Sequence, residues 1–168
     1  MKEIGGVAKT LRQLLQGPRY SIAYYQREYR WLRKQTQELV DDLCEQFLAS
    51  YSPEHQRDEV QNYGHYFLGS VILSKRENET YIVDGQQRLT TLSLLLILLH
   101  NRQGTRSDRV KLEDLIFSER FGTRTFNIAV PERLPVMESI FRDEVPVVSD
   151  ESESVRTIAA RYSDLCEL

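Results

Sequence analysis

Apolar residues recur along the first half of the chain at spacings that predict both helices and strands. Leucines at helical spacing predict a helix over 7–16 and a longer amphipathic helix over 34–50. Between them, 20–24 is expected to be a short strand. Two apolar runs, 66–74 and 80–83, flank the polar turn RENE and predict a β-hairpin.

After the hairpin, a polar junction leads into a leucine-rich helix. The helix, 89–99, is apolar almost all round, which is typical of a buried helix. It is too short to cross a bilayer, which needs about 20 apolar residues. The junction has the sequence DGQQR and places glycine, two glutamines and an arginine between a strand and a helix.

The pattern weakens in the last third of the chain. An α/β domain is predicted over 1–104, with a small mixed β-sheet and packed helices, followed by a mainly helical extension over 105–168. The final helix has no stop signal, so we expect it to continue into a longer helical region. The elements expected after residue 104 are a helix over 111–118, a strand over 124–129, a helix over 131–141 broken at Pro135, and a helix from Val155.

Composition limits the class of protein. With 40% apolar and 28% charged residues, the 168-residue chain is expected to be globular. Its net charge of −3 gives no general attraction to nucleic acid, so an anion site would have to be local. Cys44 and Cys166 lack metal-ligand spacing and are expected to be free thiols. No signal-peptide pattern follows Met1, so a cytoplasmic location is expected.

The DGQQR junction has two interpretations. In the simpler one, Asp84 caps the helix and Gln87 completes a capping box. Gly85 would then occupy the first helical position, where glycine costs roughly 0.5–1 kcal/mol relative to alanine. Arg88 would place a cation at the positive end of the helix dipole, which is unfavourable. Two broken rules at one helix end favour a binding site.

A bound anion accounts for both irregularities. Gly85 allows close backbone approach, the unpaired N–H groups of the first turn point at the anion, and Arg88 adds charged hydrogen bonds. Gln86 and Gln87 could donate to phosphate oxygens or orient water. Asp84 could cap the helix, hold a nucleotide-bound Mg²⁺ through water, or polarise a water molecule. No Walker A or Rossmann pattern occurs, so the junction by itself does not identify the anion.

A second cluster, YYQREYRWLRK at 24–34, combines aromatic and basic side chains that can stack on bases and pair with phosphates. Gln26 and Arg27, at a strand end, are candidate ligand contacts, whereas Trp31 is interpreted as the packing anchor of the following helix. Gly69 interrupts the strongest strand and marks a bulge, a close backbone approach or room for a packed helix. The histidines lack ligand spacing, so no protein-built metal site is predicted.

Four segments resemble a known family in their order and spacing: YYQREYRW, ELVDDL, YFLGSVIL and YIVDGQQRLTTLSLLL. They are similar to the N-terminal domain of GmrSD-type modification-dependent restriction proteins, which carry DGQQR and a ParB/sulfiredoxin-like fold. The resemblance implies a nucleotide-binding domain that hydrolyses GTP or ATP with Mg²⁺. It further implies an anti-phage defence system in which the domain senses foreign or modified DNA and licenses an HNH-type nuclease in another domain or subunit.

The resemblance also assigns site residues and leaves alternatives open. Arg88 and the backbone at Gly85 would hold phosphates, and Asp84 would work with water or metal. A ParB-like module that binds DNA without hydrolysis, and a ParB-like nuclease, are the alternatives. The other residues assigned are Gln86 or Gln87 to position water, Gln26 and Arg27 to close the site, and Asp42 and Gly69 as family positions.

Overall fold

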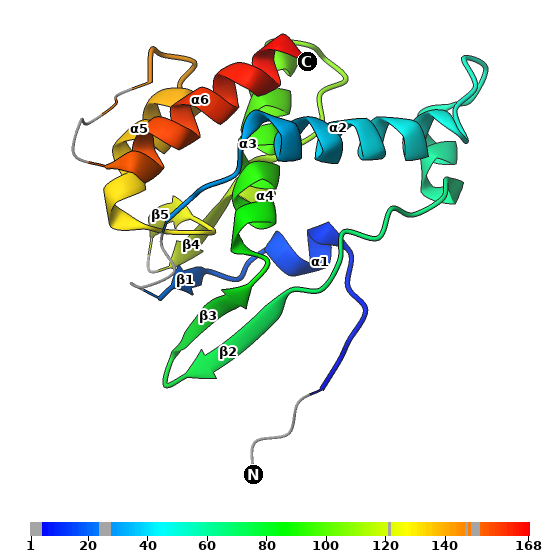
Figure 1. Cartoon of the computed structure of the whole chain (residues 1–168). Coiled ribbons are helices and arrows are strands. Elements are labelled where there is room, and N and C mark those ends of the chain that lie inside the picture. The colour runs from blue at the N-terminus through cyan, green and yellow to red at the C-terminus, as the bar shows by residue number, and fades with distance from the viewer. Residues whose placement is uncertain (1–4, 24–27, 121, 147, 149–151) are drawn as a thin grey trace.

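The computed structural model describes residues 5–23, 28–120, 122–146, 148 and 152–168 (Figure 1). They form a mixed α/β fold, as predicted, with two small sheets and several packed helices. In chain order the elements are α1 (Leu11–Leu15), β1 (Tyr20–Ile22), α2 (Arg33–Leu48), the 3₁₀ helix η2 (Arg57–Asn62), β2 (Ile72–Arg76), β3 (Glu79–Asp84), α3 (Gln86–Gln103), α4 (Glu113–Ile116), β4 (Phe117–Arg120), β5 (Thr123–Phe126), the 3₁₀ helix η3 (Pro131–Arg133), α5 (Leu134–Phe141) and α6 (Glu153–Glu167).

The main sheet is mixed, with strand order β1-β3-β2. β1 runs parallel to β3, with Tyr20 opposite Thr80, and β2 pairs with β3 as the predicted antiparallel hairpin. The parallel pair requires a long connection, which α2 and the segment after it supply. A second hairpin, β4–β5, forms its own two-stranded sheet. This arrangement brings the end of β3 to the first turn of α3.

Helix α3 lies at the centre of the molecule, against α4, α5 and α6 (Figure 1). Two of its polar residues, Thr91 and Ser93, fit this burial because their hydroxyls donate to carbonyls of the preceding turn. Each buried leucine contributes about 1.5–3 kcal/mol, so packing rather than helix propensity holds α3. Its buried residues are Leu89, Thr90, Thr91, Leu92, Ser93, Leu94, Leu96, Ile97 and Leu98.

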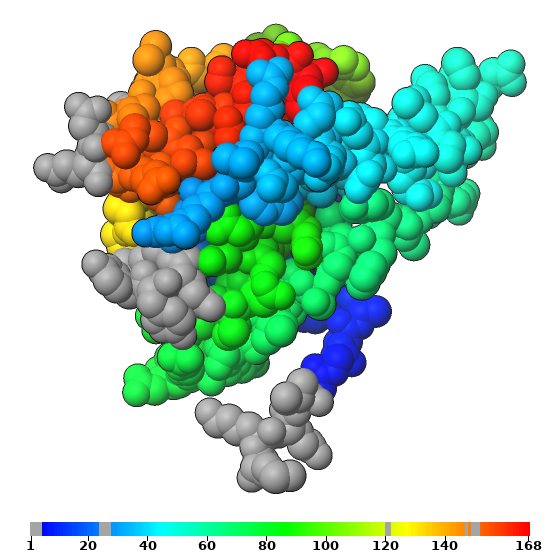
Figure 2. All heavy atoms as spheres, viewed as in Figure 1, coloured from blue at the N-terminus to red at the C-terminus, as the bar shows by residue number. Residues whose placement is uncertain are grey.

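One hydrophobic core draws on residues before and after position 104. Ile82 and Leu94 belong to it together with Val136, Ile140 and Ile158. The end of α2 and the segment after it project from this body (Figure 2). The division at residue 104 stays a prediction.

Several predicted element bounds were wrong. The strand expected over 66–74 begins only at Ile72, because Gly69 has a φ of +85° and breaks the extended run. The helix expected over 111–118 stops at Ile116, and the next four residues pair with β5. Pro135 lies in the first turn of α5, where proline is tolerated, so it does not kink a longer helix. A 3₁₀ helix, η2, occupies part of the loop expected over 50–62.

Candidate functional site

The chain changes direction in the DGQQR junction at Gly85, whose backbone dihedral angles lie in the left-handed region. β3 runs through Asp84, and Gly85, at φ +87° and ψ 2°, is the N-cap of α3. A Cβ on Gly85 would lie 3.0 Å from Val71 Cγ2 and 3.4 Å from the Ser70 carbonyl oxygen. The simpler of the two interpretations, a capping box between Asp84 and Gln87, is therefore wrong. Glycine is required by the positive φ and the close contact, and the expected penalty for glycine in the first helical position does not arise.

The first turn of α3 is left without a side-chain cap by the described residues. Asp84 is exposed at the end of its strand. The first N–H groups of a helix have no partner within the helix, and they carry the positive end of its dipole. This helix end therefore suits an anion.

Arg88 and Gly69, which are 19 positions apart in the chain, lie against each other. A Cβ on Gly69 would be 2.9 Å from Arg88 Nη1, 3.1 Å from Cζ and 3.2 Å from Nη2. The guanidinium thus covers the Gly69 backbone, and its Nη1 donates to the Ser70 carbonyl at 3.3 Å. Within the described part of the chain, Arg88 forms no ion pair. The cation is held by backbone and keeps hydrogen-bonding capacity for a ligand.

Asp42 reaches the same corner through a tyrosine that the sequence analysis missed. The Tyr66 hydroxyl donates to the Asp42 carboxylate at 2.6 Å. This hydrogen bond raises the pKa of Tyr66, and the nearby Arg88 charge acts in the opposite direction. In the sequence, Tyr66 is only the first residue of a predicted strand. Its position three residues before Gly69 is the one signal that could have indicated a place near the site.

The two glutamines of the motif differ in what they contact. Gln87 Oε1 accepts from the Arg30 backbone N–H at 2.8 Å, and Gln87 Nε2 donates to the Glu28 carbonyl at 2.7 Å. Gln86 is partly buried, and its Oε1 has no hydrogen-bond partner among the described residues. Gln87 is thus engaged by the protein itself at both ends of its amide.

The aromatic and basic cluster is only partly described. Gln26 and Arg27 lie outside the described residues. Trp31 packs against the hydrophobic core, as predicted. Tyr29 is 1% exposed, and its hydroxyl lies 2.7 Å from Thr91 Oγ1 on α3. This part of the cluster therefore anchors the chain to the core.

Histidine, cysteine and acidic side chains were compared for clustering within the described ranges. No three histidine, cysteine, aspartate or glutamate side chains gather there as a metal site. Cys44 and Cys166 are free thiols.

A protein-family model covers nearly the whole chain. The model for the N-terminal domain of the GmrSD restriction endonuclease matches residues 11–167. The chain belongs to this family. A search of curated proteins gave no match.

The GmrSD N-terminal domain match makes the chain a component of a restriction system, a form of defence. It extends from α1 through α6, so it includes the predicted helical extension as well as the DGQQR junction. No helix that the structure describes is long and apolar enough to cross a membrane.

The opposite end of α3 in this GmrSD N-terminal domain carries a cavity of about 220 Å³. Its lining holds two arginines, Arg109 and Arg142, and two carboxylates, Glu113 and Asp143. The His100 ring stacks on Phe141, with 4.9 Å between the ring centroids. The pKa of Glu113 is lowered mainly by a hydrogen bond from its own backbone N–H, and further by the neighbouring His100 and Arg109. Because arginines and carboxylates are equal in number in this lining, the cavity has no excess of arginine charge to attract an anion.

Proposed function

We propose that this domain binds GTP or ATP with Mg²⁺ at the β3–α3 junction and hydrolyses it. In this proposal, nucleotide turnover is coupled to foreign or modified DNA and licenses an HNH-type nuclease in another domain or subunit. Membership of a restriction endonuclease family supports the connection to DNA and to a nuclease. A cytoplasmic location and a ParB-like core belong to the same proposal.

The observation that carries the proposal is the meeting of Arg88, Gly69 and Gly85 at one helix end. Arg88 contacts a backbone carbonyl rather than a carboxylate, and its guanidinium rests on Gly69. Gly85 brings the backbone to the same corner, beside Ser70 and Val71. A phosphate there would meet the first-turn N–H groups and the guanidinium together.

The remaining residues take roles that their surroundings allow. Asp84 is the exposed carboxylate at the junction and would act on water or metal. Gln86 would orient the attacking water, since its amide oxygen has no partner within the described residues, whereas Gln87 is occupied. Gln26 and Arg27 are proposed to close the site.

The acidic side chains at this corner are too few to hold Mg²⁺ by themselves. They fit a Mg²⁺ ion that is held mainly by the phosphates of a bound nucleotide. Asp84 is exposed, and the Asp42 carboxylate already accepts from Tyr66. Mg²⁺ commonly keeps several waters and is held by one or two carboxylates together with substrate phosphates. Asp84 would be its protein contact, and the metal would supply neutralisation of phosphate charge.

The proposal is tested by phosphate release from the four NTPs with Mg²⁺, with and without DNA. We expect Arg88→Ala to lower release toward background, a loss of about 100-fold or more, because phosphate charge loses its main partner. Arg76→Ala is the matched control, since Arg76 is a β2 arginine whose guanidinium lies over the Tyr81 ring. Both variants must melt at temperatures close to the wild type.

Equal, background release by the wild type and Arg88→Ala, in the full-length restriction protein as well, would overturn the hydrolase proposal. Salt-dependent DNA binding that Arg88→Ala and Arg27→Ala both weaken, with no hydrolysis, would instead support a DNA-binding module.

A further inference from the structure

Residues 28–31 have no regular secondary structure, yet side chains of two helices bind their backbone. On one side is Gln87, in the first turn of α3. Its amide spans the segment, since it donates to the Glu28 carbonyl and accepts from the Arg30 N–H. These two bonds resemble those of a neighbouring β-strand, although a single side chain supplies both.

On the other side, α6 binds the two remaining residues. The Tyr29 N–H donates to Ser154 Oγ at 2.6 Å. The Arg161 Nη1 donates to the Trp31 carbonyl at 3.1 Å. Ser154 and Arg161 lie two turns apart on one helix, so α6 is hydrogen-bonded to residues 28–31 at two points.

The α6 contact is held in a fixed geometry. Arg161 is 14% exposed in its side chain, and its Nε donates to Asp164 Oδ2 at 2.5 Å. Asp164 also accepts from Arg33 at the start of α2. Because the Arg161 and Asp164 side chains are both largely buried, Arg161 loses little side-chain entropy when it holds a further group. The Arg161 guanidinium is therefore already oriented for its hydrogen bond to the Trp31 carbonyl.

We propose that Gln87, Ser154 and Arg161 are positioning residues that join α6 to the nucleotide site through residues 28–31. The inference rests on the proposed function for the identity of the ligand. Gln87 belongs to the turn whose N–H groups would hold phosphate, and its side chain is pinned by a segment that α6 holds. Loosening α6 therefore loosens the first turn of α3. By linkage, nucleotide binding in turn orders the segment and its contact with α6.

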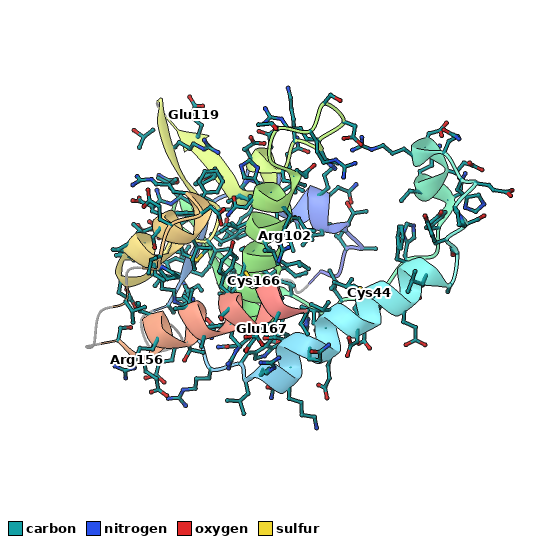
Figure 3. All side chains as sticks on the ribbon, turned by 90° about the horizontal axis from the view of Figure 1, so that it is seen from above. Cys44, Arg102, Glu119, Arg156, Cys166 and Glu167 are labelled. Atoms are coloured by element: carbon teal, nitrogen blue, oxygen red, sulfur yellow. The ribbon has the colours of Figure 1, made fainter. Side chains whose placement is uncertain are left out.

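The first test needs no ligand. Amide hydrogen exchange in the whole chain is measured at Arg30 and Tyr29. Arg161→Ala is expected to accelerate exchange at the Arg30 amide about tenfold, although Arg161 does not contact that amide. The matched control is Arg102→Ala, because Arg102 also donates to α6, at the Cys166 carbonyl, but does not touch residues 28–31 (Figure 3). Equal exchange at Arg30 in both variants would overturn the proposal.

The second test is a double-mutant cycle on nucleotide affinity with Mg²⁺ present. Gln87→Met and Arg161→Ala are each expected to weaken affinity about tenfold, and their combination to weaken it no further than the larger single effect. A merely structural role would make the Arg161 and Arg102 variants alike in affinity once their stabilities are matched.

The outcomes separate this inference from the function on which it rests. Fully additive losses, or a loss of kcat at unchanged affinity in Gln87→Met alone, would return Gln87 to a water-orienting role and overturn the coupling. If the wild type binds no nucleotide, the proposed function fails, while the exchange at Arg30 still decides whether α6 holds the segment.

Discussion

The two ends of α3 differ in how charged side chains are placed relative to the helix dipole. At the C-terminal end, His100 and Arg102 lie in the last turn, where cations interact favourably with the helix dipole. The Asn101 side chain there donates to the Ile140 carbonyl and the Tyr162 hydroxyl. The protein thus satisfies this end with its own groups.

The N-terminal end does the opposite. It places the cation Arg88 where the dipole is already positive, and the described residues supply no carboxylate to it. The neighbouring Asp42 carboxylate accepts from Tyr66 instead. The contrast teaches that a site is indicated by charge left unmatched at a rigid helix end, and less by the presence of polar residues or of a cavity.

The largest effect is expected from Gly69→Ala. The new methyl group would enter the space of the Arg88 guanidinium and would require a positive φ at a non-glycine residue. We expect nucleotide affinity to fall by about 100-fold, which corresponds to about 2.7 kcal/mol. Isothermal titration with a non-hydrolysable NTP and Mg²⁺ measures the change.

Gly17→Ala is the control for that loss. Gly17 has a φ of +93°, but no atom lies within 4 Å of the position a Cβ would take. The control therefore carries a comparable backbone strain, of about 1–2 kcal/mol, without touching Arg88. If Gly17→Ala weakened nucleotide binding as strongly, the loss would reflect general destabilisation and the role given to Gly69 would be wrong.

A comparison of glycines at the two helix ends should show the next largest effect. Gly85→Ala combines a positive φ with a Cβ at 3.0 Å from Val71 Cγ2, whereas Gly104→Ala meets no atom within 4 Å. We expect Gly85→Ala to lower the free energy of unfolding by about 2–3 kcal/mol and Gly104→Ala by about 1–2 kcal/mol. Urea denaturation of both variants measures the difference, and a larger loss in Gly104→Ala would contradict the contact at Gly85.

The sequence predicted those elements whose hydrophobic pattern is local. Leucine spacing located α2 and α3, and the turn between two apolar runs located the β2–β3 hairpin. It also singled out Gly69, Gly85 and Arg88, although the positive φ of Gly85 as N-cap, and not a position inside the helix, accounts for that glycine. The structure brings these three residues to one corner.

The rest depended on contacts between distant residues. The run YFLGSVIL has no periodicity that distinguishes a strand from an irregular segment, and the guanidinium that lies against Gly69 belongs to an arginine 19 positions away. Gln87 has the spacing of a capping box, but its partners are backbone groups at Glu28 and Arg30. Local sequence rules cannot distinguish such a long-range hydrogen bond from a cap.

Asn101→Ala should alter stability at the far end of α3 without altering the site. The substitution leaves the Ile140 carbonyl and the Tyr162 hydroxyl without the donor they share. We expect the free energy of unfolding to fall by about 1–2 kcal/mol, with nucleotide affinity unchanged. Thermal unfolding and titration of the same sample test both statements. A parallel loss of affinity would mean that the two ends of α3 are not independent.

The smallest effect concerns the titration of Tyr66. Its pKa is raised by the hydrogen bond to Asp42, so the bond stabilises the fold below the ordinary tyrosine pKa of about 10, and this contribution is lost as pH rises through the raised value. Tyr66→Phe should therefore lower stability at neutral pH by a few tenths of a kcal/mol and flatten its alkaline decline.

The same tyrosine also distinguishes the two ends of α3. The hydrogen bond to Asp42 raises the pKa of Tyr66 and the Arg88 charge partly offsets that rise, whereas burial raises the pKa of Tyr162 at the other end. A phosphate bound to Arg88 would neutralise the arginine charge that lowers the pKa of Tyr66. Nucleotide should therefore raise the pKa of Tyr66 further and leave the pKa of Tyr162 unchanged. NMR of ring-labelled tyrosine, with Tyr66→Phe to assign the signal, follows both residues. Equal movement of both, or of neither under saturating nucleotide, would place the anion away from Arg88.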